Sequence, residues 1–226
     1  MKNSWFHLAY LAMLFVLQPA AAQCVKSTPY SQDFEGTNWI PQTNWSNSGS
    51  IPSCWSRVQV SNNYLWMAGP PSFASLNSGP FDDHTPGNGG GYAVAEGWFT
   101  GFTSPNATVT HLVTPPIDLS NDTLPRLIFY YHMYGSDIDF LHVGVRKVGT
   151  NTWTQIHTVN STTASNQFAS SNSEWRKHVG SLANWAGDTI QIRFSAKRNV
   201  NFSWWTNSRI SIDDILVEET PSCDLP

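Results

Sequence analysis

The chain has 226 residues, enough for one sizeable domain, and a formal net charge of -4 with only 12% of its residues charged. This charge balance excludes a nucleic-acid-binding domain, because such a domain needs a basic face. Eleven Trp, twelve Phe and seven Tyr supply a large aromatic core. Outside the N-terminus no long segment has the 3.6-residue apolar period of a helix, so the composition predicts an all-β protein.

The N-terminus has the pattern of a signal peptide at residues 1–22. Lys2 supplies the positive end, Leu8–Leu17 is apolar, and Ala20 to Ala22 have the small-residue spacing of a cleavage site. The alternatives are a membrane anchor, for which the apolar run is shorter than the ~20 residues of a span, and a lipoprotein modified at Cys24. Cleavage after Ala22 predicts a secreted or cell-surface protein with no transmembrane segment left.

Short runs typical of strands follow one another along the chain and are separated by turn residues. We predict strands at Tyr30–Glu35, Cys54–Val60, Tyr64–Met67, Tyr92–Glu96, His111–Thr114, Leu127–Tyr134, Asp139–Arg146, Thr152–Val159, Trp175–Leu182, Ile190–Ala196 and Arg209–Val217, and Ile117–Leu119 starts the run that leads into Leu127–Tyr134. Ser78–Gly91 is Gly-rich and Ser161–Ser173 is rich in Ser, Thr and Asn, so both are expected to be loops. This many short strands predict a jelly-roll β-sandwich of two antiparallel sheets.

The run Leu127–Tyr134 is apolar on both faces, which is typical of a strand in the middle of a sheet that is covered on both sides. Gly135 to Asp137 then supply the permissive residues of a tight turn. We therefore expect Leu127–Tyr134 to pair with Asp139–Arg146 as an antiparallel hairpin.

The last strand contains an irregularity at Asp213 and Asp214. Ile210 and Ile212 have one parity along the strand, whereas Ile215 and Val217 have the other. A regular strand cannot bury all of them on one side, so a β-bulge at the two Asp residues is expected. The alternative is a strand that is buried on both faces.

Three cysteines are present, namely Cys24, Cys54 and Cys223, so at least one is free or pairs outside the chain. The pair Cys24–Cys54 is the favoured disulfide. Cys24–Cys223 is possible if the termini meet, and Cys54 could instead be a buried free thiol.

Several motifs in order resemble the MAM domain family. They are the Gly-Pro…Asp-His-Thr…Gly pattern at Gly79–Tyr92, the Phe-x-Tyr-His-Met-Tyr-Gly pattern within Leu127–Arg146, and Ile212-Asp213-Asp214-Ile215. We place a MAM-like domain at residues 30–219, between a lead-in at 23–29 and a linker at 220–226 towards a further module. That tail is similar to the lead-in of fibronectin type III modules of bacterial surface proteins, so a bacterial secreted multidomain protein is expected.

The resemblance implies an extracellular, non-catalytic adhesion or recognition module whose partner is a protein or a glycan. The catalytic patterns G-x-S-x-G, H-E-x-x-H and C-x-x-C are all missing from the sequence, which agrees with this expectation. The alternative is an accessory carbohydrate-binding domain of a secreted hydrolase whose catalytic part is not in this chain.

Two candidate sites follow. Glu35, Asp83 and Asp213 lie at irregular places in a weakly charged chain, and the resemblance implies a structural cation at positions matching them, for which Ca²⁺ is the expected ion. The alternative is that these carboxylates accept backbone hydrogen bonds. Trp204 and Trp205 could stack on a partner or cover an end of the sandwich.

Arginines beside the strands are expected to be solvated, with their stems packed down. They are Arg126, Arg146, Arg193 and Arg209.

Overall fold

A computed structural model describes residues 24–41, 49–59, 64–69, 78–85, 91–97, 109–199 and 208–222. The predicted signal peptide, the pair Trp204–Trp205 and Cys223 lie outside the described residues. No helix in the described part is both long and apolar enough to cross a membrane.

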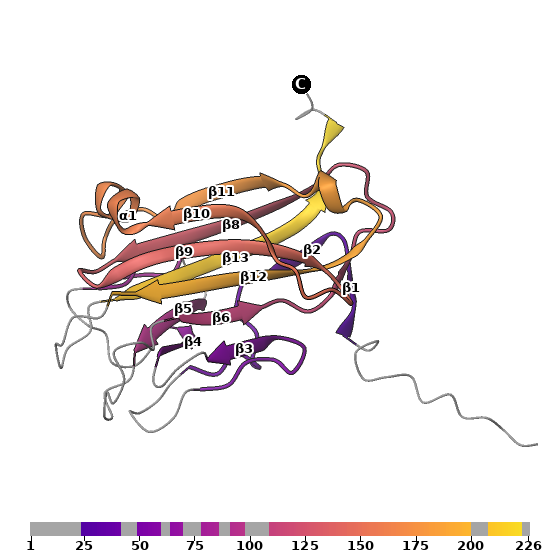
Figure 1. The fold of residues 1–226 in the computed structure, drawn as a ribbon. Coiled ribbons are helices and arrows are strands. Elements are labelled where there is room, and N and C mark those ends of the chain that lie inside the picture. Colours follow the sequence, from indigo (N-terminus) through magenta and orange to yellow (C-terminus); the bar gives the residue numbers. More distant parts are fainter. Residues whose placement is uncertain are drawn as a thin grey trace, which may run out of the picture.

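The described strands form two sheets that pack face to face (Figure 1). The seven-stranded sheet contains β1 (Lys26–Ser27), β3 (Ser56–Gln59), β6 (Val109–Val113), β7 (Ile117–Asp118), β9 (Ile138–Lys147), β10 (Thr154–Asn160) and β12 (Thr189–Arg198). The six-stranded sheet contains β2 (Tyr30–Gln32), β4 (Tyr64–Gly69), β5 (Tyr92–Gly97), β8 (Pro125–Tyr134), β11 (Arg176–Ser181) and β13 (Arg209–Glu219). The predicted all-β sandwich is confirmed, and β1–β7 is its one parallel pair among the described strands.

Each sheet is organised around one long strand. β12 pairs with β9 along one edge, and along the other edge with β7 and then β6. β13 likewise pairs with β8 along one edge, and along the other with β5 and then β2. The second edge of β13 therefore passes from one partner strand to another part-way along its length.

The main core lies between the sheets and is built from alternate residues of the long strands. Phe129 is fully buried and Trp55 is 5% exposed. A smaller cluster of Met67, Tyr92 and Val94 packs with Trp175 apart from this core. Apolar residues on both faces of the six-stranded sheet explain the two-sided apolar pattern of Leu127–Tyr134.

The predicted hairpin between Leu127–Tyr134 and Asp139–Arg146 is wrong. β8 pairs with β11 and β13, whereas β9 pairs with β10 and β12, so the turn at Gly135 links the two sheets. A tight turn within a sheet and a short arch between sheets both need permissive residues, and Gly135 has a φ of 149°. Strands from later in the chain occupy both edges of β8, and the sequence pattern does not reveal this.

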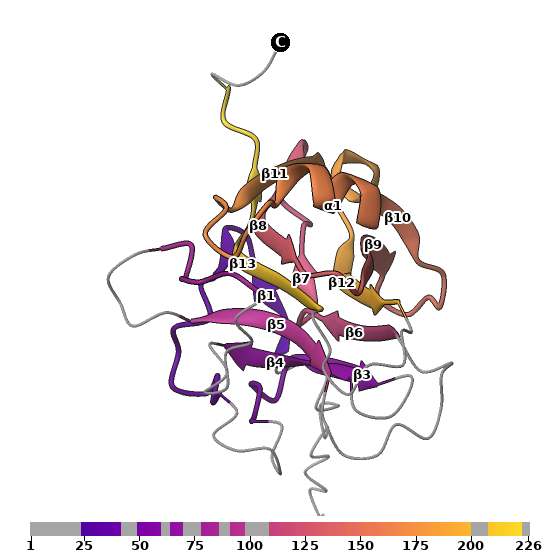
Figure 2. The same cartoon turned by 90° about the vertical axis from the view of Figure 1, so that its left-hand side faces the viewer.

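The segment predicted as a loop at Ser161–Ser173 begins with a short helix, α1 (Ser161–Gln167). The side chain of Asn160 caps it by accepting a hydrogen bond from the backbone N–H of Thr163 at 2.9 Å. Ala164 and Phe168 bury the inner side of this turn. Figure 2 shows α1 beside β10 and β11, where the edges of the two layers meet.

A disulfide joins Cys24 and Cys54, which is the pairing favoured from the sequence. It ties the segment before β1 to the residues that lead into β3. Nearby, the rings of Phe34, Trp39 and Trp55 pack with centroids 4.7 to 6.0 Å apart. The start of the described chain is therefore held both covalently and by aromatic packing.

Candidate functional site

The candidate site forms where β13 changes its partner strand. β5 pairs with Ile210–Ile212, and β2 pairs with Ile215–Val217 on the same edge. On the other edge Asp213 lies opposite Tyr130 and Leu216 lies opposite Ile128 of β8, so β13 carries one extra residue. This is the β-bulge predicted from the sequence, and it is confirmed.

The bulge has a clear physical cause in the apolar pattern of β13. It lets Ile210, Ile212, Ile215 and Val217 all enter the main core, each at most 1% exposed. The bulge places Asp214 at a positive φ of 45°, a backbone conformation that only a few residue types adopt readily. Such strain persists only where surrounding contacts hold it.

A loop at residues 78–85 brings polar groups to the bulge. The backbone N–H of Gly79 donates to the carbonyl of Tyr134 at 3.1 Å, and that of Phe81 donates to the carbonyl of Ser171 at 2.8 Å. The indole N–H of Trp175 donates to the carbonyl of Asp82 at 3.1 Å. These contacts hold the loop over the six-stranded sheet with Asp83 and His84 next to β13.

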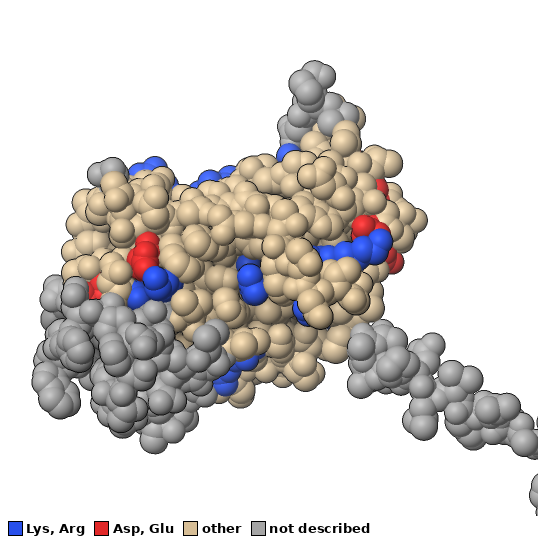
Figure 3. All heavy atoms as spheres, viewed as in Figure 1, with Lys and Arg blue, Asp and Glu red and all other residues tan. Residues whose placement is uncertain are grey.

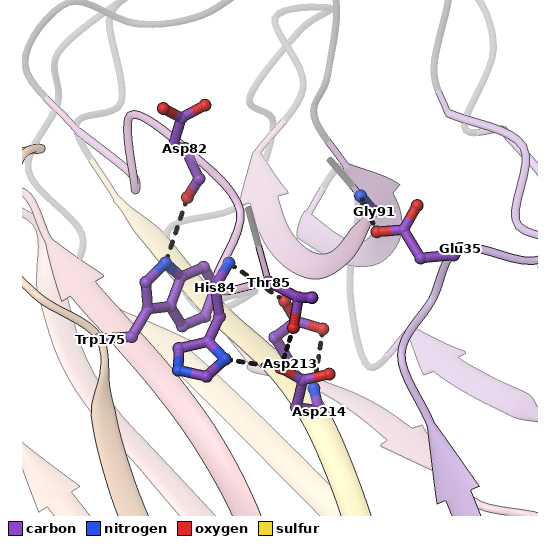
Figure 4. Close-up of polar contacts among 8 residues, drawn as sticks. All are labelled: Glu35, Asp82, His84, Thr85, Gly91, Trp175, Asp213 and Asp214. Atoms are coloured by element: carbon purple, nitrogen blue, oxygen red, sulfur yellow. Dashed lines mark hydrogen bonds and ion pairs between the residues drawn. The ribbon is translucent and has the colours of Figure 1, made fainter. Parts of the chain in front are cut away.

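The loop and the bulge are joined by hydrogen bonds to both Asp residues of β13 (Figure 4). Asp213 accepts from the backbone N–H of His84 at 3.3 Å and from that of Asp214 at 2.7 Å. Asp214 Oδ2 lies 2.5 Å from His84 Nδ1 and also accepts from the Thr85 hydroxyl at 2.5 Å. The His84 ring stacks on Tyr130 with a centroid separation of 3.5 Å.

Glu35 reaches the same region from the segment that follows β2. Its Oε1 accepts a hydrogen bond from the backbone N–H of Gly91 at 2.8 Å. A Cβ atom on Gly91 would lie 2.6 Å from the carbonyl oxygen of Phe34, so only glycine fits there. Phe34 has a φ of 60°, and it and Asp214 are the two non-glycine residues with positive φ in the described part. Backbone strain is thus concentrated at this site.

Glu35, Asp83 and Asp213 form no ion pair with a Lys or Arg side chain within the described part of the chain. Asp213 is fully buried, and burial, followed by contact with Asp83, raises its pKa to about 10. Burial also raises the pKa of Glu35. The negative charge of Asp83 raises it further, whereas the hydrogen bond from the Gly91 backbone lowers it. Both carboxylate oxygens of Asp83 are buried without a hydrogen-bond donor. Ionised carboxylates accept but cannot donate, so contacts between them need a shared proton or a cation.

The predicted residues Glu35, Asp83 and Asp213 are therefore neighbours, linked through Asp83. Yet no group of three or more His, Cys, Asp or Glu side chains forms a ready-made metal site within the described ranges. A cation would have to draw the carboxylates together. The donors that these residues offer are carboxylate oxygens, which suit a hard cation such as Ca²⁺.

The contact between His84 and Asp214 also has the form of a pair that could activate a nucleophile. In the described part no hydroxyl or thiol is hydrogen-bonded to the other ring nitrogen of His84. The ring is instead packed between Tyr130 and Trp175. This arrangement fits a structural tie better than a catalytic pair.

Comparison with known proteins identifies the family of the chain. The family model of the MAM domain, meprin/A5/mu, matches residues 33–224. The chain belongs to the MAM domain family. Neuropilin-1a of Danio rerio is 32% identical to this MAM domain over 104 residues, which are 46% of the chain and 10% of that protein. The chain thus spans about a tenth of that relative's length.

Solved structures with a similar fold include two adhesin domains of Lys-gingipain from Porphyromonas gingivalis W83. The K1 cleaved adhesin domain has a TM-score of 0.51 and 16% identity, with 86% of this chain and 99% of that chain covered. The K3 domain has a TM-score of 0.46 and 16% identity, with 75% and 94% covered. At this identity the K1 likeness indicates a shared fold and no more.

Three residues that hold the carboxylates of this MAM domain were not predicted from the sequence. His84, Thr85 and Gly91 supply hydrogen bonds to the two Asp residues and to Glu35. The signal was present, because His84 and Thr85 directly follow Asp83 in the Asp-His-Thr motif. Their role depends on a contact between residues about 130 positions apart, which no local pattern encodes.

Proposed function

We propose that this MAM domain is a secreted, non-catalytic recognition module that binds a protein or glycan partner and is stabilised by Ca²⁺. Membership of the MAM family supports a binding role. The main supporting observation is that the carboxylates of Asp213 and Asp214 are engaged in holding the fold together. Asp213 and Asp214 fasten the loop at residues 78–85 to the bulge of β13.

The burial of these groups argues against hydrolysis at this site. A glycosidase needs two carboxyl groups roughly 5–10 Å apart that both reach the substrate. Asp213 is fully buried, and Oδ2 of Asp214 is engaged by His84 and Thr85. Asp213 is therefore not available to a bound sugar, so a supporting role is the better interpretation.

Glu35, Asp83 and Asp213 are the residues that would hold the cation. Ca²⁺ would supply positive charge where Asp83 has buried oxygens without donors. It would thereby tie together the segment after β2, the loop at residues 78–85 and the bulge. The role is stabilisation of the binding module, since no reacting group is in contact with these residues in the described part.

An extracellular location fits the covalent chemistry of the chain. The disulfide Cys24–Cys54 persists in oxidising compartments and is rare in the cytosol. The predicted signal peptide at residues 1–22 would direct the chain there. Secretion or display at the cell surface is therefore part of the proposal.

Binding and turnover can be tested together on the secreted chain. The immobilised protein is exposed to a panel of extracellular matrix proteins and of neutral and acidic polysaccharides, with CaCl₂ or with a chelator. We expect saturable binding to at least one member, weakened by the chelator, and no released sugar or peptide. Cleavage of any panel member would contradict the non-catalytic role, and a lack of binding to every member would contradict recognition.

A further inference from the structure

The outer face of the seven-stranded sheet carries a shallow groove over β9 and β12. Gly144 lies opposite Arg193 on β12 and Gln155 on β10, so the middle of the face lacks one side chain. Trp153 leans over this gap, and a Cβ atom on Gly144 would lie 3.7 Å from its ring. The resulting hollow has a volume of about 180 Å³.

Arg193 lines this groove, and Arg146 lies with it against the ring of Trp153. The guanidinium carbons of Arg146 and Arg193 are 4.7 and 4.4 Å from the centre of its ring. Arg146 donates two hydrogen bonds to the side-chain oxygen of Gln191, at 3.1 and 2.7 Å. These contacts orient the guanidinium groups but provide no negative charge.

Arg193 has neither a carboxylate nor a hydrogen-bond partner among the described residues, and its Nε is buried. Burial, and then the charge of Arg146, lower its pKa. Two like charges at a half-buried position cost free energy unless an anion balances them. The prediction that these arginines are simply solvated edge residues does not describe them, since β12 and β9 both lie inside the sheet.

The acidic residues that the structure describes do not fill this role. Asp139, at one end of the groove, forms an ion pair with Lys197 at 2.7 Å. Figure 3 looks onto this face. Its middle carries Lys and Arg side chains with no Asp or Glu beside them, and the visible acidic side chains lie toward its two ends. A net charge of -4 makes this local excess of positive charge more notable.

Flat rings and neutral hydrogen-bonding groups flank the arginines. Phe140 and His142 stack with centroids 3.6 Å apart and ring planes at 5°. His111 Nδ1 lies 2.8 Å from the Ser195 hydroxyl, and burial lowers the His111 pKa to about 4, which keeps the ring neutral at pH 7. Aromatic faces next to polar groups suit a sugar, whose ring has apolar faces and hydroxyl edges.

We propose that this groove binds a carboxylate-bearing sugar residue of an acidic glycan, with Arg193 and Arg146 contacting the carboxylate. This inference rests on the proposed recognition function and names its ligand class. The hollow is smaller than the roughly 300–1,000 Å³ of pockets that enclose a drug-sized ligand. It therefore suits one residue of a longer chain that continues across the open face.

A peptide is less well matched to the same surface. Extended peptides commonly gain affinity by adding a strand to a free sheet edge. The groove lies over β9 and β12, whose edges are already paired with β10, β6 and β7. The two larger hollows, of about 830 and 710 Å³, are lined by one lysine and by no charged residue, so neither offers a comparable anion site.

The test uses calorimetric titration of the secreted chain. The probes are hexasaccharides of glucuronate and of mannuronate, with glucose and mannose hexasaccharides as neutral matches and hexaglutamate as an acidic peptide. Because a charge-assisted contact typically changes affinity about tenfold or more, at least one uronate should bind at least that much more tightly than its neutral match. Arg193→Gln should abolish this preference. Gly144→Ala is a second variant, because the added methyl group occupies part of the hollow without a close clash.

The matched control is Arg176→Gln, which removes the same charge from the exposed strand β11 on the other sheet. It should leave uronate binding unchanged. Equal binding of acidic and neutral sugars, no uronate binding, tighter binding of hexaglutamate, or full binding by folded Arg193→Gln would each overturn the proposal. If the panel of matrix proteins and polysaccharides contains a partner but neither uronate binds, the recognition function is retained and the assignment of the groove to an acidic sugar is rejected.

Discussion

Arg209 and Glu96 form an ion pair inside the protein, with 2.9 Å between Arg209 Nη2 and Glu96 Oε1. The residues are 2% and 7% exposed, and they lie next to the pair Ile210–Ala95 at the end of the antiparallel pairing of β13 with β5. Burial raises the pKa of Glu96, and Arg209 opposes that effect. The prediction of a solvated Arg209 is therefore wrong.

Removing one partner of this pair should destabilise the fold strongly. Glu96→Gln leaves the Arg209 charge buried without its carboxylate, and such changes cost about 3–5 kcal/mol. The double variant Arg209→Met/Glu96→Leu should cost clearly less, because it removes both charges. Urea unfolding of the three proteins measures this difference. A single variant as stable as the wild type would contradict the interpretation of a pair that balances buried charge.

The core prediction concerns Phe129. Its ring packs 5.2 Å from that of Phe194, across the interface between the sheets, and it is fully buried. Phe129→Ala should lower the free energy of unfolding by roughly 3–5 kcal/mol, since it leaves a cavity. Val179→Ala on β11 is the control, because Val179 is 52% exposed and should change stability little. Equal denaturation midpoints for Phe129→Ala and wild type would place the ring outside the core.

The predictable part of the fold depends on local patterns. The strands and the bulge can be predicted from the sequence, because two-sided apolar runs, Gly and Pro turns and the parity switch in β13 are visible in it. The pairing between distant strands is not visible in any local pattern. The turn at Gly135 was compatible with a hairpin and with an arch, and only the positions of β11 and β13 decide between them. Arg209 was misjudged for the same reason, since Glu96 is 113 residues away.

Stability should depend on pH through His157 and His178, which face each other from the edges of the two sheets at a centroid separation of 3.8 Å. Burial lowers the pKa of both rings, and His157 lowers that of His178 further, to about 4. Between about pH 4 and the ordinary His pKa of about 6.5, the unfolded chain binds more protons than the folded one. The free energy of unfolding therefore rises as the pH rises across this window, and it decreases as the pH falls.

The measurement is urea unfolding at pH 5 and pH 7 for wild type and His178→Gln. The variant should show a smaller loss of stability at pH 5, because one depressed group is gone. Other buried histidines, such as His132 with a pKa of about 4, keep part of the slope. An unchanged slope in the folded variant would show that His178 does not contribute.

The candidate site was predictable in its acidic residues and not in their connections. Glu35, Asp83 and Asp213 stood out because carboxylates are scarce in this chain and occur where its strands are irregular. The backbone donors of His84 and Gly91 depend on how a loop lies across β13. Such contacts arise from tertiary packing, so residue types alone do not specify them.

The final prediction is a crossover in the stability of Asp83→Asn. In a chelator the variant should unfold at a higher temperature than wild type, because it removes a buried carboxylate that contacts Glu35 and Asp213 without a donor. With Ca²⁺ the order should reverse, since ligand binding adds about 2.7 kcal/mol at a hundredfold excess over the dissociation constant and the variant loses a ligand. Asp82→Asn is the matched control, because that neighbouring side chain is exposed and points away from Asp213 (Figure 4). It should keep the full response to Ca²⁺. Wild-type melting temperatures that are equal with chelator and with Ca²⁺ would reject the cation site, and a response that survives in Asp83→Asn would move it elsewhere.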